Sequence, residues 1–152
     1  MTHQYAFQTE VPADKSRLEI ERTLIRYGAS AFGYMWEGNS VRIGFKMNGR
    51  QIKFALQMPD PQAKEFRFTP KTGKRRSDMA LEQAYEQAVR QKWRSLVLVI
   101  KAKLEAIESG ISTFENEFLA NIMLPDGSTV SDFMLPQIER VYQTREMPRL
   151  LT

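Results

Sequence analysis

The stretch that decides the fold runs from residue 31 to residue 58 and reads AFGYMWEGNSVRIGFKMNGRQIKFALQM. Apolar and polar residues alternate in SVRIGFKM (40–47) and in QIKFALQM (51–58). This period of two is typical of strands with one buried and one solvent-exposed face. Asn48-Gly49 between them favours a two-residue hairpin turn, because both positions tolerate positive φ. With a second turn signal after AFGYMW, the stretch predicts a three-stranded antiparallel meander whose first strand spans about 31–37.

A helix is predicted before the meander, over about residues 14–27. Asp14 or Ser16 can cap it, and Ser16 with Glu19 has the spacing of a capping box, in which each side chain satisfies a backbone donor of the first turn. Gly28 supplies the left-handed residue with which such helices end.

A long helix is predicted after the meander, beginning at Ser77 or Asp78 and running to Ser109. Its apolar residues fall on one stripe at helical spacing. The β-branched run SLVLVI (95–100) also fits a buried strand, and this alternative stays open. Residues 59–76, rich in proline and ending in a basic run, are predicted to form a loop with a short extended piece at Phe66-Arg67-Phe68.

The C-terminal region is predicted to be helical. Ser112 and Glu115 have capping-box spacing, and a final helix is expected at about 136–142 with Pro136 in its first turn. The sequence thus predicts an α+β fold in one domain, with an N-terminal helix, a three-stranded antiparallel meander, a long helix and a helical C-terminal region. Residues 13–110 would form the α-β-β-β-α core and residues 111–152 an acidic helical extension.

The charge of the chain is divided unevenly along its length. The net charge of +4 conceals −1 over residues 1–41, +10 over residues 42–103 and −5 over residues 104–152. A basic centre of this kind predicts contact with a polyanion, and an acidic end predicts contact with a basic surface.

The basic centre supplies the candidate binding residues. Cations that neutralise phosphates provide most of the affinity for nucleic acid, and interleaved aromatic rings can stack on unpaired bases. Three candidates lie on the polar side of the predicted strands, and one continuous surface results if the loop folds beside that face. The predicted nucleic-acid-binding residues are Arg42, Lys46, Lys53, Lys64, Arg67, Lys71, Lys74, Arg75 and Arg76. Arg90, Lys92 and Arg94 of the long helix would extend this surface.

Simpler interpretations of the same residues stay open. Basic runs are usually solvated, and Phe66 and Phe68 can serve only to anchor the loop to the core. An acidic protein partner, or the acidic C-terminal region of a neighbouring copy of this chain, would use the same charges.

Most enzyme chemistries find no support in the composition. The chain has no cysteine and a single histidine, His3, which argues against a thiolate metal site, a cysteine nucleophile and a histidine-rich site. Carboxylates of the C-terminal region could gather around magnesium, but a solvated acidic face is the simpler interpretation. We expect no catalytic residues, metal or cofactor, although a metal-dependent activity stays open. The start of the chain lacks a signal-peptide pattern and no apolar run is long enough to span a membrane, which predicts a cytoplasmic protein without membrane contact.

The order helix, three-stranded meander, basic loop, helix is similar to the double-stranded-RNA-binding domain. In that family cations at the start of the second helix grip phosphates, and Lys74, Arg75 and Arg76 stand at the matching place. The chain departs from the family in its second helix, which is only partly alanine-rich, and in its tighter meander turns. A fold analogy of this kind does not settle function.

Residues 13–151 also resemble a family of small uncharacterised proteins of bacteriophages and other bacterial mobile elements. The resemblance rests on the stretches ADKSRLEIERTLIRYGA, MNGRQIKFALQMP, RQKWRSLVLVIKAKLEAIESGISTFENEFLANIMLPDG and LPQI. It implies a bacterial cytoplasm and a mobile-element context, and it assigns no functional residues.

Two functions are predicted. The first is a non-enzymatic nucleic-acid-binding accessory protein, DNA or RNA being left open, that contacts phosphates through the basic loop and sheet face. The alternative is a protein–protein interaction module, such as an anti-defence inhibitor or an assembly component, or a homo-oligomer. Its contacts would come from the acidic C-terminal residues Glu115, Glu117, Asp126, Asp132 and Glu139.

Overall fold

The computed structural model describes residues 14–148, so His3 lies outside the described part of the chain. A helix, α2 (Asp14–Arg26), precedes three strands, β1 (Ala31–Glu37), β2 (Ser40–Met47) and β3 (Arg50–Gln57). After the strands come the elements α3 (Lys64–Arg67), α4 (Asp78–Glu108), α5 (Phe114–Phe118), a 3₁₀ turn η2 (Leu119–Asn121) and α6 (Val130–Thr144). The predicted α+β order is confirmed.

The three strands form an antiparallel sheet in the order β1-β2-β3. Phe45 of β2 is paired with Phe32 on one side and with Ile52 on the other, so that apolar residues of all three strands share one face. Asn48 and Gly49 both have positive φ, at 52° and 72°, which confirms the predicted hairpin turn.

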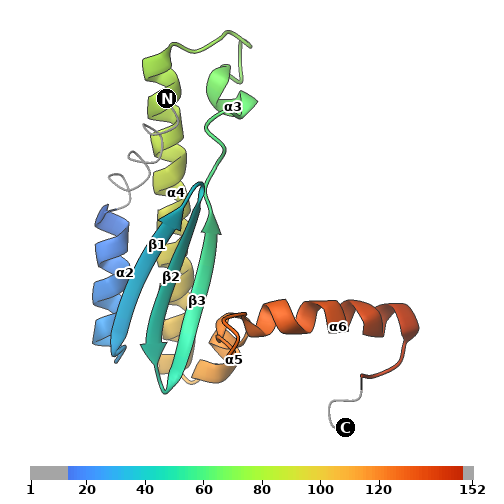
Figure 1. Ribbon diagram of the computed structural model, residues 1–152. Helices are drawn as coiled ribbons and strands as arrows, with labels where there is room; N and C mark the ends of the chain where they lie inside the picture. The colour runs from blue at the N-terminus through green and yellow to red at the C-terminus, as the bar shows by residue number, and fades with distance from the viewer. Residues whose placement is uncertain (1–13, 149–152) are drawn as a thin grey trace.

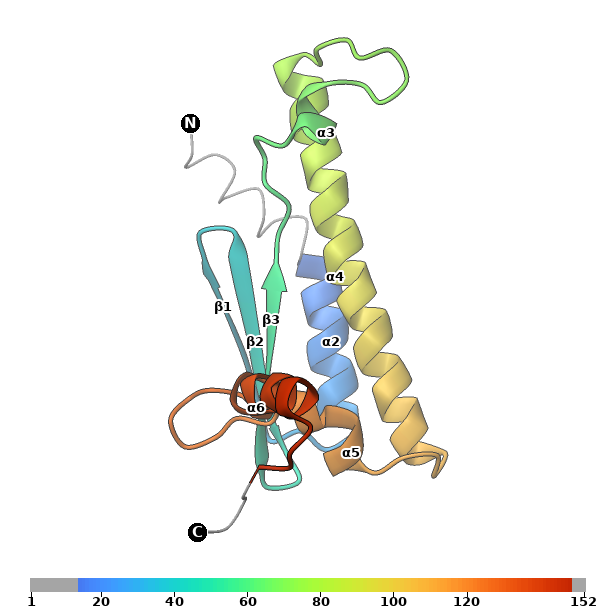
Figure 2. The same ribbon diagram turned by 90° about the vertical axis from the view of Figure 1, so that its right-hand side faces the viewer.

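Two helices cover the apolar face of the sheet. In Figure 2 the sheet lies on one side of the molecule and α2 with α4 on the other, so the fold has two layers. The core between them includes Leu24 of α2, Ile43 of β2 and Trp93 of α4, all buried. The opposite face of the sheet carries the alternate residues of the strands, and no described helix covers it. We call it the open face; its residues are Ala31, Gly33, Met35, Glu37, Ser40, Arg42, Gly44, Lys46, Gln51, Lys53, Ala55 and Gln57.

The long helix α4 is continuous through SLVLVI, so the alternative of a buried strand there is wrong. Leu96, Val97 and Ile100 face the core at helical spacing. The Ser77 hydroxyl accepts a hydrogen bond from the backbone N–H of Ala80 and caps the helix, as predicted. The first part of α4 extends beyond the end of the sheet (Figure 1).

Two predicted details before α4 differ in the structure. Helix α2 as described already includes Asp14 and Ser16, so Ser16 and Glu19 do not form a capping box; Glu19 instead contacts α4. The piece predicted as extended at residues 66–68 is mostly the short helix α3, because Phe66 turns inward to pack on α4.

The C-terminal helices also begin elsewhere than predicted. Thr113, one residue later than predicted, caps α5 by accepting from the backbone N–H of Asn116. Helix α6 begins six residues before Pro136, which therefore lies inside it. Its start is fixed by a capping box in which Thr129 and Asp132 each accept a backbone N–H of the other.

Residues 121–129 attach the C-terminal region to the free edge of β3. Ile122 forms a bridge with Ile52, and the backbone N–H of Met123 donates to Gln51 over 2.8 Å. From this edge α6 extends away from the sheet in Figure 1, and Figure 2 views it end-on. None of the described helices is long and apolar enough to cross a membrane.

Candidate nucleic-acid interface

The basic loop forms a compact tip at one end of the molecule. We call residues 64–76 the basic tip. Its anchor is Phe66, only 5% exposed, whose ring meets the ring of Tyr85 edge-on at 5.6 Å between centroids. Phe66 therefore serves as a packing residue, which was the simpler interpretation of the sequence. Phe68 is 36% exposed and stays at the surface of the tip.

The rest of the basic tip is an ordered hairpin. The backbone N–H of Arg76 donates to the carbonyl oxygen of Arg67 over 2.7 Å, and that of Thr69 donates to Lys74 over 2.9 Å. Gly73 closes the turn with a φ of +67°, a conformation that glycine adopts without strain. The cations of this segment are thus displayed on a defined backbone.

The cations of the basic tip have no carboxylate partner among the residues that the structure describes. Five are exposed and one, Arg76, is half-buried. Carboxylates lie close in the sequence, at Glu65 and Asp78, but neither makes an ion pair with a tip residue in the described chain. The unpaired cations are Lys64, Arg67, Lys71, Lys74, Arg75 and Arg76.

The three strand cations lie on the open face, as predicted, but they are not equivalent. Arg42 and Lys46 are exposed. Lys53 is half-buried, and its ammonium donates to the carbonyl oxygen of Gly127 over 2.8 Å. Lys53 therefore holds the 121–129 segment on the sheet.

Two carboxylates around Lys53 are also engaged locally. The Ser128 hydroxyl and backbone N–H donate to Asp126 and, helped by the Lys53 charge, hold the pKa of that carboxyl below its usual value. Hydrogen bonds from Thr129, with a smaller contribution from Lys53, likewise lower the pKa of Asp132. Positive and negative charges compensate one another at this corner of the open face.

The predicted single basic surface does not form. In both views the tip lies beyond the end of the sheet, beside the first turns of α4. The strand register places Lys46 next to the hairpin turn at residues 48–49, at the opposite end of the sheet from the point where β3 leaves for the tip. The loop thus does not fold beside the open face. The anchor Phe66 instead holds the loop against Tyr85 of α4.

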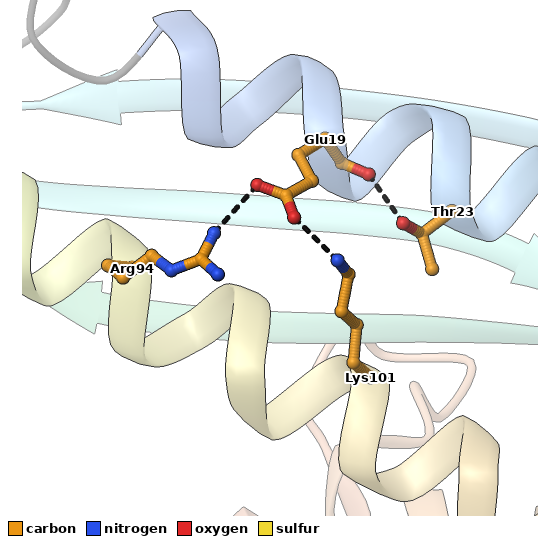
Figure 3. A network of polar contacts seen from close by, with 4 residues as sticks. All are labelled: Glu19, Thr23, Arg94 and Lys101. Atoms are coloured by element: carbon orange, nitrogen blue, oxygen red, sulfur yellow. Dashed lines mark hydrogen bonds and ion pairs between the residues drawn. The ribbon is translucent and has the colours of Figure 1, made fainter.

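The helix cations that were expected to extend the surface are mostly paired. Arg90 lies 3.5 Å from Glu86, and Arg94 lies 2.8 Å from Glu19. The second oxygen of Glu19 accepts from Lys101, so that one carboxylate of α2 holds two cations of α4 (Figure 3). The hydrogen bond from Lys101, opposed by partial burial and helped by Arg94, lowers the pKa of Glu19.

A groove between α2 and α4 was not predicted from the sequence. This groove, of about 580 Å³, is lined by Lys15, Arg22 and Arg26 of α2 and by Lys101 of α4, with Glu19 in its wall. The three α2 cations are spaced by seven and four residues, a helical period that the sequence does contain. The slightly negative total of residues 1–41 concealed it.

The acidic residues of the C-terminal region do not gather into one patch. Glu117 lies 3.8 Å from Lys103, and Glu139 accepts a hydrogen bond from Gln143. Asp126 and Asp132 form the hydrogen bonds described above. Of the five acidic residues, only Glu115 has no described hydrogen bond or ion pair of its side chain. Within residues 14–148, no three histidine, aspartate or glutamate side chains are placed so that they could hold a metal ion.

Comparison with known proteins gave no match to a family model, to a curated protein or to a solved structure.

Proposed function

We propose that the basic tip binds the phosphates of a nucleic acid, and that the protein acts by binding and not by catalysis. The observation that carries the proposal is the set of six tip cations without a carboxylate partner in the described chain. Cations already paired within a protein must lose that partner to bind phosphate. Unpaired cations on an ordered hairpin meet no such competition and release counterions on binding.

This proposal is narrower than the sequence-based one. It assigns the phosphate contacts to residues 64–76 and leaves out Lys53, whose ammonium is bonded to Gly127. Arg42 and Lys46 lie on the open face of the sheet, so they serve as a comparison within the same molecule.

The tip also offers one aromatic ring to a ligand. Phe68 is partly exposed between the cations, whereas Phe66 is buried. A ring at this position can stack on an unpaired base, and this contributes roughly 1–3 kcal/mol per base in proteins that bind single strands. The proposal therefore favours single-stranded or looped nucleic acid over a regular duplex.

The test is fluorescence anisotropy with single- and double-stranded DNA and RNA over a series of salt concentrations. Affinity is expected to fall with salt, with a logarithmic slope of about 0.7–0.9 per phosphate neutralised. The triple variant Lys74→Ala, Arg75→Ala, Arg76→Ala should flatten this slope by about 2 to 3 units. The matched control removes three cations elsewhere, with Arg42→Ala, Lys46→Ala and Arg50→Ala, and should change it little.

Two outcomes would contradict the proposal. One is binding that does not respond to salt. The other is an equal loss of affinity in the tip variant and in the control, because net charge and not the tip would then determine binding.

The alternative function, docking through an acidic C-terminal surface, has less support. Glu117, Asp126 and Asp132 are engaged with neighbouring groups of their own chain. The C-terminal region also exposes large apolar side chains, among them Leu135, Ile138 and Tyr142, which points to a contact of different chemistry.

A further inference from the structure

Helix α6 is an amphipathic helix that contacts η2 beside its first turn and leaves its apolar side chains exposed. None of its fifteen residues is buried. Leu135, Ile138 and Tyr142, spaced by three and four residues, form one apolar stripe, with exposed fractions of 59%, 42% and 80%. An isolated helix of this length is marginal in water, and in folded proteins such a stripe is normally covered.

The direction of α6 is fixed, and it leads away from its own chain. The Thr129–Asp132 capping box and a hydrogen bond from the backbone N–H of Val130 to the carbonyl oxygen of Ile122 hold its first turn at the edge of β3. From there the helix points outward (Figures 1 and 2). The apolar stripe therefore cannot be covered by the sheet of the same chain.

The open face of the sheet is a second surface that no described helix covers, and small residues lie near its centre. Gly33 is paired with Gly44, which is paired with Lys53 on its other side, and the neighbouring rows pair Ala31 with Lys46 and Ala55 with Arg42. A hollow of about 300 Å³ lies over this part of the sheet, with Met123 among its lining residues. Large side chains from another element can pack over this part of the sheet without a clash.

We propose that α6 of one copy of this chain packs across the open face of a second copy, and that the two copies exchange these helices in a symmetric dimer. The helix carries bulky apolar side chains where the face has glycine and alanine, so the two surfaces are complementary in shape. At about 1.5 Å per residue, α6 is about 22 Å long. This length crosses three strands spaced about 4.8 Å apart.

Geometry favours a second copy as the partner more than charge does. The open face exposes Arg42 and Lys46 together with Glu37, and α6 exposes Glu139 beside Arg140, while Asp132 is held in the capping box of its own helix. Because α6 leaves the edge of β3 across the strand direction, a two-fold axis parallel to the strands at this edge places each helix over the other sheet. Such an interface is isologous and closes on itself. It does not depend on nucleic-acid binding, since the basic tip lies beyond the other end of the sheet.

Light scattering with size-exclusion chromatography tests the proposal on the full chain. The wild type is expected at twice the chain mass of 17.6 kDa. Ile138→Asp and, separately, Gly33→Gln should shift it to the monomer mass. Both sites suit this use, because Ile138 is exposed and a side chain added at Gly33 meets no atom within 4 Å. Leu98→Asp, at an exposed apolar site on α4, is the control and should stay dimeric.

A cross-link identifies which surfaces meet. The chain has no cysteine, so Ile138→Cys and Gly33→Cys can be introduced separately and the two variants mixed. An interchain disulfide in the mixture, absent from each variant alone, supports the exchange. A wild-type monomer at all concentrations overturns it. So does a disulfide in the Ile138→Cys variant alone, which would mean that the two α6 helices pair with each other, or a dimer that persists in Gly33→Gln.

Discussion

The basic tip holds six cations and the groove between α2 and α4 is lined by four, and the two regions differ in what surrounds these cations. In the groove, the Glu19 carboxylate lies in the wall with Lys15, Arg22 and Arg26, for which no ion pair is described, and it binds Lys101 and Arg94 (Figure 3). In the tip, no described carboxylate pairs with any of the cations. A count of charges along the sequence does not report which carboxylate lies among which cations. We expect a carboxylate within a group of cations, such as Glu19 in the groove, to weaken that group as a site for an external phosphate.

The largest expected effect comes from removing the anchor of the tip. Phe66→Ala should destabilise the attachment of α3 to α4 by about 3 kcal/mol, the usual cost of deleting a buried aromatic ring, because Phe66 is 5% exposed and packs on Tyr85. Nucleic-acid affinity should fall although every cation is retained. Hydrogen exchange of the tip amides and anisotropy titration measure the two effects.

Phe68→Ala is the matched control for the hydrogen-exchange measurement alone, because its ring is also proposed to stack on bases. Phe68 is partly exposed, so its loss should cost below about 1 kcal/mol of stability. Full affinity in the Phe66→Ala variant would show that the order of the tip is irrelevant to binding.

The next largest effect is a difference in nucleic-acid affinity between variants of the tip and of the groove. Lys15→Ala, Arg22→Ala and Arg26→Ala remove three groove cations, and Lys74→Ala, Arg75→Ala and Arg76→Ala remove three tip cations. At moderate salt we expect about a 100-fold loss of affinity in the tip variant and less than about threefold in the groove variant. Anisotropy at one fixed salt concentration compares them. Similar losses would mean that the groove is part of the binding surface.

Much of the fold was predictable because its signals are local. Strict alternation and the Asn48-Gly49 turn define the meander, and Ser77 caps α4 where it was expected to. The predicted start of α6 is wrong, because Pro136 lies inside the helix and not in its first turn. The Thr129–Asp132 spacing was the better signal, since an internal proline costs one helical hydrogen bond while a capping box satisfies two donors at the start.

The candidate site was less predictable because its decisive contacts join distant parts of the chain. Glu19 is 75 residues from Arg94 and 82 from Lys101, and no sequence spacing reports such pairs. The same holds for Lys53 and Gly127, 74 residues apart. Sequence patterns identified which residues could bind phosphate, whereas tertiary packing decided which of them are already engaged.

A smaller effect is expected at the turn of the tip. Gly73 has a φ of +67° and open space around it, so Gly73→Ala introduces backbone strain of about 1 kcal/mol without a clash. The Arg76 amide, which closes the hairpin with Arg67, should then exchange about fivefold faster with solvent. Gly33→Ala is the control, because Gly33 has ordinary φ and equally open surroundings. Equal exchange of the Arg76 amide in both variants would show that the turn is not strained by a side chain.

The smallest effect is expected from changing Glu19, and it is a gain of nucleic-acid binding at the groove. Glu19→Gln releases Arg94 and Lys101 from their shared carboxylate, so salt-dependent binding to the groove should rise by about threefold. Since the side chains of both ion pairs are 30–52% exposed, the loss of stability should stay below about 1 kcal/mol. Glu21→Gln on the same helix, where no ion pair is described, is the control for both measurements.

The pH dependence of the free energy of unfolding tests whether the Glu19 ion pairs stabilise the fold. The pKa of Glu19 is lowered from 4.5 in the folded protein, so the ionised carboxylate favours folding. Its contribution is present at neutral pH and is lost as the pH falls below 4.5 through the folded pKa. Urea unfolding of the wild type and of Glu19→Gln should therefore differ at pH 7 and converge toward pH 3. A difference that is constant over this range would mean that Glu19 acts through packing, and the contrast between tip and groove would then lose its electrostatic basis.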